Sequence, residues 1–375
     1  MKEKILSLLA CPSCGGDLIL ESFETERQEV REGMLKCACG HWFPIIACIP
    51  RLLLREYRGD YRDFIKTHGL NHFEQGRGIS PHSISKEKQV QESFGSKWMS
   101  QPKWGTRGET KTFMSEWVLD KYEWGNNEGF KKAIGSKKNI LDAGTGLGRV
   151  VADFCEVNKR GEVFGIDLSE AVEGAYQNTK QYPNAHILQA DLMNLPFKRS
   201  FFDFIFSEGV LHHTPDTHKA FEVLIKFLAP KGEIAIYVYK KKGPIREFCD
   251  DYLRGFTTHL SEKECWEFSK RMTKFGKALS DLHIEFEVPE DIPALGMKAG
   301  KYNLQRFFYY HIFKCFWNER FNFDENNLVN FDWYHPAYAY RHTPEEVKTW
   351  FQKAGLELVH IDISESGITA RGLKP

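Results

Sequence analysis

The sequence contains no apolar stretch that approaches the ~20 residues of a membrane-spanning helix. The apolar segment before Cys11 covers only six residues, which is shorter than the roughly 7–15 residues of a signal-peptide core. Charge of one sign is not in excess either, because 51 basic residues face 51 acidic ones. This balance argues against a large polyanionic partner such as nucleic acid. We expect a cytoplasmic protein without a membrane span.

The nine cysteines do not suggest a disulfide framework, since their number is odd and no secretory signal precedes them. Four of them form two close pairs, Cys11 with Cys14 and Cys37 with Cys39, and a glycine follows each pair. Four thiolates from two tight turns satisfy a tetrahedral zinc ion with no open position. We therefore predict a structural Zn²⁺ held by these four residues.

Residues 1–55 resemble the zinc-ribbon family typified by the tRNA-methyltransferase activator subunit. The second pair departs from the family, because it is C-x-C and not the commoner C-x-x-C, and Cys48 stands where glycine is usual. Such a ribbon either docks on a catalytic domain and covers apolar surface, or presents a protein or RNA substrate. The neutral overall charge favours docking.

Short apolar strands alternate with helices between residues 139 and 240, which predicts a mainly parallel sheet with helices on both faces. The pattern stops at Lys240 and resumes at Thr343 with a helix and two closing strands. Residues 243–335 carry helical patterns and many aromatics instead. The five strands expected before Lys240 cover residues 140–142, 163–166, 186–188, 202–206 and 234–239.

Three glycines, Gly144, Gly146 and Gly148, lie between the first of these strands and the next helix. Glycine permits positive φ and has no Cβ, so a ligand can lie against the backbone. The spacing is G-x-G-x-G, and Arg149 stands where a dinucleotide fingerprint needs glycine. Asp142 just before the loop suits a cationic amino group better than a pyrophosphate.

Two further acidic residues follow the next two strands. Asp167 ends the second strand and could accept both hydroxyls of a ribose through its two oxygens. Asp191 follows the third strand and could bind an adenine amino group. Each feature alone has an ordinary structural explanation, a tight turn or a solvated strand end. Their succession in this order is much more specific.

The region resembles the class I S-adenosylmethionine-dependent methyltransferase family, over roughly residues 136–240 and 343–373. The similarity is carried by the glycine loop and by the segments 165–169, 190–192, 202–206, 210–216 and 228–233. Residues 210–216 are similar to the ubiquinone/menaquinone-type branch. The resemblance implies an α/β, Rossmann-like sheet of seven strands, the last antiparallel.

The resemblance also implies S-adenosyl-L-methionine as cofactor. The residues expected to bind it are Asp142, Gly144, Thr145, Gly146, Gly148, Asp167, Leu168, Asp191, Leu192 and Glu208. For a hydroxyl acceptor, His213 or Glu208 is the candidate base. The alternative is that His212 and His213 only set the turn and cap the following helix.

The predicted organisation has five parts, with the acceptor bound under a helical lid inserted between strands five and six. Tyr302, Arg306 and Tyr309 are expected to share one face of a lid helix, and Tyr237 to approach the cofactor's cation. The alternative is that these aromatics form the core of a helical cap. The parts are a zinc ribbon at 1–55, a linker with helices at 56–135, the methyltransferase core at 136–240, the lid at 241–335 and the rest of the core at 336–375.

The function predicted first is methyl transfer from S-adenosylmethionine to a small or medium organic acceptor by in-line displacement. Residues 92–98 resemble segments of ribbon-headed bacterial methyltransferases associated with glycans or secondary metabolites, and a lipid acceptor fits the same size class. Two alternatives stay open: a methyltransferase for RNA or protein with the ribbon as reader, and a non-catalytic partner that binds cofactor. The sequence leaves the oligomeric state open.

Overall fold

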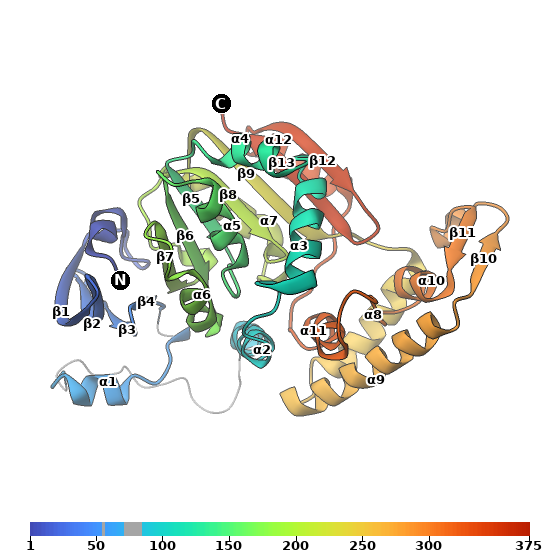
Figure 1. Ribbon diagram of the computed structural model, residues 1–375, viewed down its shortest axis with the longest axis horizontal. Coiled ribbons are helices and arrows are strands. Elements are labelled where there is room, and N and C mark those ends of the chain that lie inside the picture. The colour runs from blue at the N-terminus through green and yellow to red at the C-terminus, as the bar shows by residue number, and fades with distance from the viewer. Residues whose placement is uncertain (55–56, 71–84) are drawn as a thin grey trace.

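The computed structural model describes residues 1–54, 57–70 and 85–375, and these ranges are the basis of every structural statement below. Strands form one long sheet with the N-terminal ribbon at one end and the helical insertion beyond the other (Figure 1). Within the described ranges, none of the helices is both long and apolar enough to cross a membrane.

The ribbon is a small antiparallel sheet preceded by a short helix. Two turns that carry the cysteine pairs flank its strands β1 and β2. Its elements are η1 (Glu3–Leu8), β1 (Leu18–Glu26), β2 (Glu29–Cys37), β3 (Trp42–Ile46) and β4 (Ile49–Leu52).

The central sheet has the order β7-β6-β5-β8-β9-β13-β12. Its first five strands are parallel, and β13 pairs antiparallel with both β9 and β12. This arrangement confirms the predicted α/β class and the closing hairpin. The strands are β5 (Asn139–Ala143), β6 (Glu162–Asp167), β7 (Ala185–Ala190), β8 (Phe202–Glu208), β9 (Leu228–Tyr239), β12 (Glu357–Ile363) and β13 (Gly367–Leu373).

The expected seven-stranded sheet does not end at β7, because β4 of the ribbon pairs parallel with it. Arg51 lies opposite Gln189, and Leu52 lies opposite Ala190. The pairing satisfies backbone groups that an edge strand would expose, and it gives a continuous sheet of eleven strands. The ribbon therefore docks on the core, the first of the two arrangements considered from the sequence.

Side chains alternate across the parallel strands, so the sheet separates two apolar clusters. One cluster contains Leu141 and Phe164 and extends to Ile5 and Leu9 of the ribbon. The other contains Ile140 and lies under the helices before and after β5. The covering helices are α7 (Thr217–Phe227) and α12 (Pro344–Lys353) on the first face, and α3 (Gly108–Lys121), α4 (Asn127–Ile134), α5 (Arg149–Val157) and α6 (Ala171–Thr179) on the second.

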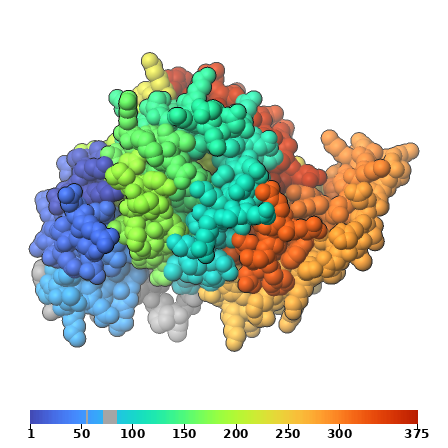
Figure 2. All heavy atoms as spheres, viewed as in Figure 1, coloured from blue at the N-terminus to red at the C-terminus, as the bar shows by residue number. Residues whose placement is uncertain are grey.

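The insertion between β9 and α12 extends away from the sheet, and its hairpin is the part farthest from the ribbon (Figures 1 and 2). Stacking of Trp266 on Phe331, with ring centroids 3.8 Å apart, joins its two long helices. Its elements are α8 (Pro244–Thr257), α9 (Glu262–Asp281), β10 (Glu285–Val288), η5 (Pro293–Leu295), β11 (Gly300–Asn303), α10 (Leu304–His311) and α11 (Phe323–Tyr334).

The prediction that Tyr302 shares a helix with Arg306 and Tyr309 is wrong. Tyr302 lies in β11 opposite Phe286, and the helix begins only after Asn303, whose side chain caps it through the Arg306 amide. Asparagine satisfies an otherwise unpaired N–H at a helix start, which fixes the boundary at this residue. Arg306 and Tyr309 do lie on α10.

We expect Ile5→Ala to lower the free energy of unfolding of the whole chain by about 2–5 kcal/mol, because it leaves a cavity in the core shared by ribbon and sheet. Ile5 is 2% exposed. The control is Ile19→Ala in the same ribbon, since the Ile19 side chain is 69% exposed. Calorimetry should show one transition that shifts only in the first variant. A separate ribbon transition would contradict a shared core.

Candidate active site and zinc centre

The carboxyl ends of β5, β6, β7 and β8 meet at one edge of the sheet, where the structure has a cavity of about 300 Å³. Parallel strands bring the residues that follow them to the same edge, which is where open α/β sheets bind ligands. Every residue expected to bind the cofactor lines this cavity except Gly148. Gly148 instead begins α5 with φ of 76°.

The glycine loop has the conformation that its sequence predicts. Gly144 and Gly146 both have positive φ, 91° and 51°. A Cβ on Gly144 would lie 2.3 Å from a methyl group of Val210, and one on Gly146 would lie 3.1 Å from the Trp98 indole. Glycine is therefore required here by close packing as well as by the backbone.

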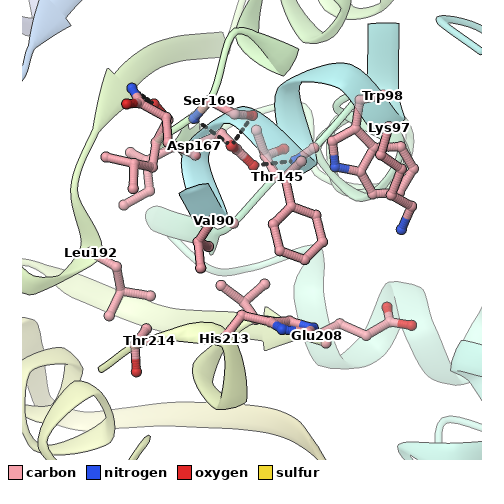
Figure 3. A pocket seen from close by; sticks show the side chains of 18 of the residues that line it. Val90, Lys97, Trp98, Thr145, Asp167, Ser169, Leu192, Glu208, His213 and Thr214 are labelled. Carbon is pink, nitrogen blue, oxygen red and sulfur yellow. Dashed lines mark hydrogen bonds between the residues drawn. The ribbon is translucent and has the colours of Figure 1, made fainter. Parts of the chain in front are cut away.

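Asp167 holds the glycine loop in place. Its Oδ2 accepts a hydrogen bond from the Gly146 amide at 2.9 Å, and its Oδ1 accepts from the amide and hydroxyl of Ser169 at 2.9 and 2.6 Å (Figure 3). A carboxylate oxygen has two lone pairs, so Oδ2 can still accept one ligand hydroxyl, and Oδ1 can accept another once the Ser169 hydroxyl turns away from it. Burial raises the pKa of Asp167, and these hydrogen bonds oppose the shift.

Asp142 is buried at the end of β5, and its Oδ2 has no hydrogen-bond partner. Burial raises the pKa of this carboxyl to about 7, although Thr145 and Arg149 favour its ionised form. The hydroxyl of Thr145 is likewise buried without a partner. An unpaired buried carboxylate is costly, so the site suits a ligand that brings a cationic donor.

Helix α2 (Lys86–Ser100) covers the cavity, and the sequence analysis assigns no role to its individual side chains. Phe94, Lys97 and Trp98 follow i, i+3, i+4 spacing, the signal that places them on one helical face. The Lys97 ammonium lies 3.9 Å from the Trp98 ring centroid and 2.7 Å from Asp332 of α11. Figure 3 shows Trp98 near Asp167, across the pocket from His213 and Glu208.

The two histidines have different environments. His213 lines the cavity, and its Nδ1 lies 2.7 Å from the Tyr338 carbonyl. Burial lowers its pKa to about 4, so the ring is neutral at pH 7 and donates from Nδ1, which leaves Nε2 as an acceptor. His212 is fully buried, and its ring stacks on that of Tyr239 with centroids 3.7 Å apart. Its Nδ1 accepts a hydrogen bond from the backbone amide of Tyr239.

Glu208 lies at the end of β8 and lines the cavity. Its Oε2 is 3.3 Å from Nη2 of Arg149, the residue that follows the glycine loop. Burial raises the pKa of Glu208, and the Arg149 charge opposes this shift. The pair leaves the carboxylate partly neutralised inside the pocket.

The predicted acceptor residues separate into two groups. Tyr237 lines the cavity, whereas Tyr302, Arg306 and Tyr309 do not. The insertion extends outward, so that of its helices only α11 reaches the pocket, through Asp332. The cover over the cavity is α2, not a lid formed by α10.

The four predicted zinc ligands lie together at the tip of the ribbon. The sulfur atoms of Cys11, Cys14, Cys37 and Cys39 all lie within 4.8 Å of one another. The Cys48 thiol is not part of this group. The cluster has the number and type of donors that a closed zinc site requires, and the C-x-C spacing of the second pair does not prevent it.

Two protein families match different parts of this sequence. Residues 134–287 match the family described as Methyltransferase domain, and residues 2–46 match the family described as Trm112p-like protein. Among solved structures, magnesium protoporphyrin IX methyltransferase from Synechocystis is 11% identical with a TM-score of 0.43, and covers 79% of this chain and 100% of its own. A complex containing the Haloferax volcanii Trm112 methyltransferase activator is 14% identical with a TM-score of 0.38, and the match covers 75% of this chain and 97% of the matched chain.

Curated relatives match part of the same central region. Phosphoethanolamine N-methyltransferase 2 of Caenorhabditis elegans is 32% identical over 154 residues, 35% of this chain and 34% of the relative. Demethylmenaquinone methyltransferase of Staphylococcus haemolyticus is 34% identical over 102 residues, 27% and 42%. The chain thus spans less than half of the length of these two relatives. Residues 134–287 thus form a methyltransferase domain, and residues 2–46 form a Trm112p-like domain.

Proposed function

We propose that the protein transfers a methyl group from S-adenosylmethionine to a small or medium organic acceptor. The observation that carries this proposal is the buried, unpartnered Asp142 Oδ2 beside the glycine loop, in one cavity with Asp167 and Asp191. Asp142 offers a carboxylate to the ammonium group of the cofactor. Asp167 offers oxygens to its ribose, and Asp191 offers a carboxylate to its adenine amine. The volume of about 300 Å³ lies at the lower end of small-molecule sites.

The cofactor supplies a sulfonium whose methyl group is already electrophilic, so the chain's own residues mainly have to bind, orient and exclude water. Helix α2 closes the cavity with Trp98 over the glycine loop. Tyr237 and Tyr239 contribute aromatic faces that favour a nearby cation. We assign the neutral Nε2 of His213 as the base for a hydroxyl acceptor, while His212 positions Tyr239.

Isotope transfer tests the proposal against both alternatives. Methyl-labelled cofactor is supplied with the protein to a cell extract, which is then separated into small molecules, RNA and protein. Label in the small-molecule fraction supports the proposal. Label confined to RNA or protein would establish the ribbon as a reader, and cofactor binding without any transfer would favour a non-catalytic partner.

We expect Asp167→Ala to weaken cofactor binding by roughly 2–4 kcal/mol, because two charge-assisted hydrogen bonds are lost. Asp203→Ala is the matched control. Asp203 also accepts two backbone hydrogen bonds, from Lys138 and Asn139. It lies near the start of β8, whereas the cavity lies at the carboxyl end of that strand. Titration calorimetry should find weaker binding only in the first variant. Equal affinities in both would refute the assignment of Asp167.

Cofactor affinity should depend on pH through Asp142. Its pKa is raised to about 7, so below that pH a proton must leave before the carboxylate can pair with an ammonium. Affinity should therefore fall by up to about tenfold per pH unit as the pH drops below 7. Calorimetry across this range measures it, with the isosteric Asp142→Asn as control. A slope that persists in the control would assign the dependence to another group.

We propose further that the cysteine cluster holds one structural Zn²⁺ per chain, because its four sulfur donors match the coordination of a closed zinc site. Metal analysis of protein purified without added zinc should find about one equivalent. Cys14→Ser should lose the metal and lower the melting temperature, because an incomplete site binds zinc weakly. Cys48→Ser, in the same ribbon, should retain it. Wild-type protein without metal and with four freely titratable thiols would refute the site.

A further inference from the structure

Three cations of the insertion gather behind the cavity wall and are not explained by the cofactor site. Lys242 precedes α8, Arg246 lies on α8, and Lys314 lies between α10 and α11. Arg246 and Lys314 are 1% and 5% exposed. Charged residues are almost never buried this far without partners, so their pairing has to be accounted for.

One indole ring separates this cluster from the cavity. The Trp333 ring centroid is 5.5 Å from the Arg246 guanidinium and 5.3 Å from the Lys314 ammonium. The Trp333 ring also lies 5.2 Å from that of Tyr239, which lines the cavity. Tyr309 contacts the same two cations at 5.4 and 5.3 Å. The cations therefore share a layer of aromatic rings with the site.

A second connection runs through the closing hairpin. Lys242 donates hydrogen bonds to the carbonyls of Glu365 and Ser366. The next residue, Gly367, packs directly against Tyr237, since a Cβ there would lie 2.3 Å from the phenol ring. Tyr237 lines the cavity, and Lys242 is only partly buried. Tyr237 and the turn of this hairpin therefore connect the wall of the cavity to Lys242.

The carboxylates of this region do not balance its cations. Asp250 bonds Nε of Arg246 at 2.6 Å, and Asp332 is engaged by Lys97. Among the described residues, Nη1 of Arg246 is buried without a partner, and Lys314 Nζ has only a 3.4 Å contact with the Tyr309 hydroxyl. The Glu365 carboxylate lies exposed at the rim.

Burial lowers the pKa of both lysines and the Arg246 charge adds to the shift, whereas the Asp332 charge opposes it at Lys314. The pKa of Lys242 is lowered to about 7, and that of Lys314 to about 8. The charge of a bound anion would raise both pKa values, because an opposite charge favours the protonated ammonium. One oxygen of Asp250, Oδ1, is also buried without a partner, so a hydroxyl on the same ligand would complete its hydrogen bonding.

We propose that Lys242, Arg246 and Lys314 form a subsite for an anionic group of the acceptor, a carboxylate or a phosphate. This inference rests on the proposed function, whose acceptor it narrows to an organic anion. Planar guanidinium and mobile ammonium groups together suit either oxyanion. The rest of the acceptor extends past Tyr237 toward the cofactor.

The test measures binding of phenyl phosphate and benzoate to the full chain by titration calorimetry, with benzyl alcohol as the neutral probe. At least one anion should bind saturably and the alcohol should not. Lys314→Met keeps most of the side-chain volume, and it should weaken anion binding by about tenfold or more. The control is Lys270→Met on α9 of the same insertion, because the Lys270 side chain is exposed. This variant should bind the anion with the same affinity as wild type.

Absence of saturable binding by both anions, or equal affinity in Lys314→Met and wild type, would overturn the subsite. If Lys314→Met does not fold, Lys242→Met replaces it, since the Lys242 side chain donates only to backbone carbonyls. Amine acetylation of wild-type protein adds an independent readout: phenyl phosphate should protect Lys242, the more accessible of the two lysines. The Asp167→Ala variant should still bind the anion. Retained anion binding in a protein that never binds cofactor would count against the proposed function alone.

Discussion

The carboxylate of Asp167 is the interaction on which the geometry of the site depends. It joins the amide of Gly146 to the amide and hydroxyl of Ser169, so the loops after β5 and β6 are fixed to each other. Helix α2 then packs on this frame, with Trp98 against Gly146 and the Gln91 amide bonded to the Leu168 carbonyl. Without a rigid frame the cover would have no fixed surface to close on.

Buried charge distinguishes this cavity from an ordinary apolar pocket. Inside it, Lys97 is paired with Asp332 and Arg149 with Glu208. Asp142 lacks a cationic partner at hydrogen-bonding distance, and behind the wall Arg246 pairs with Asp250, whereas Lys242 and Lys314 form no ion pair with a described residue. Leaving a charge buried without a partner costs free energy that a complementary ligand recovers on binding. In the proposed function, Asp142 receives the ammonium group of the cofactor, and the cations behind the wall receive the anionic group of the acceptor.

The ribbon and the insertion extend the same core in different ways. The ribbon continues the sheet through β4 and shares its apolar cluster, so it is part of the core that supports the central sheet. The insertion packs largely on itself and meets the cavity through Asp332 and the aromatic layer of Trp333. Its contribution is chemical, because it supplies the charges that the sheet edge itself does not provide.

The sequence by itself determined the parts of this protein whose signals are local. Strand rhythm, the glycine loop, Asp142, Asp167 and the cysteine pairs are read from neighbouring residues, because periodicity and turn chemistry act over a few positions. The position of Tyr302 was mistaken because its helical spacing continues across the capping residue Asn303.

Only the tertiary structure decided which distant segments meet. Pairing of β4 with β7, closure of the site by α2, and the gathering of Lys242, Arg246 and Lys314 join residues separated by tens to hundreds of positions. No periodicity records such contacts, since they depend on the packing of whole elements. The predicted acceptor residues Tyr302, Arg306 and Tyr309 do not line the cavity, because their spacing along the chain does not determine how the insertion packs on the sheet.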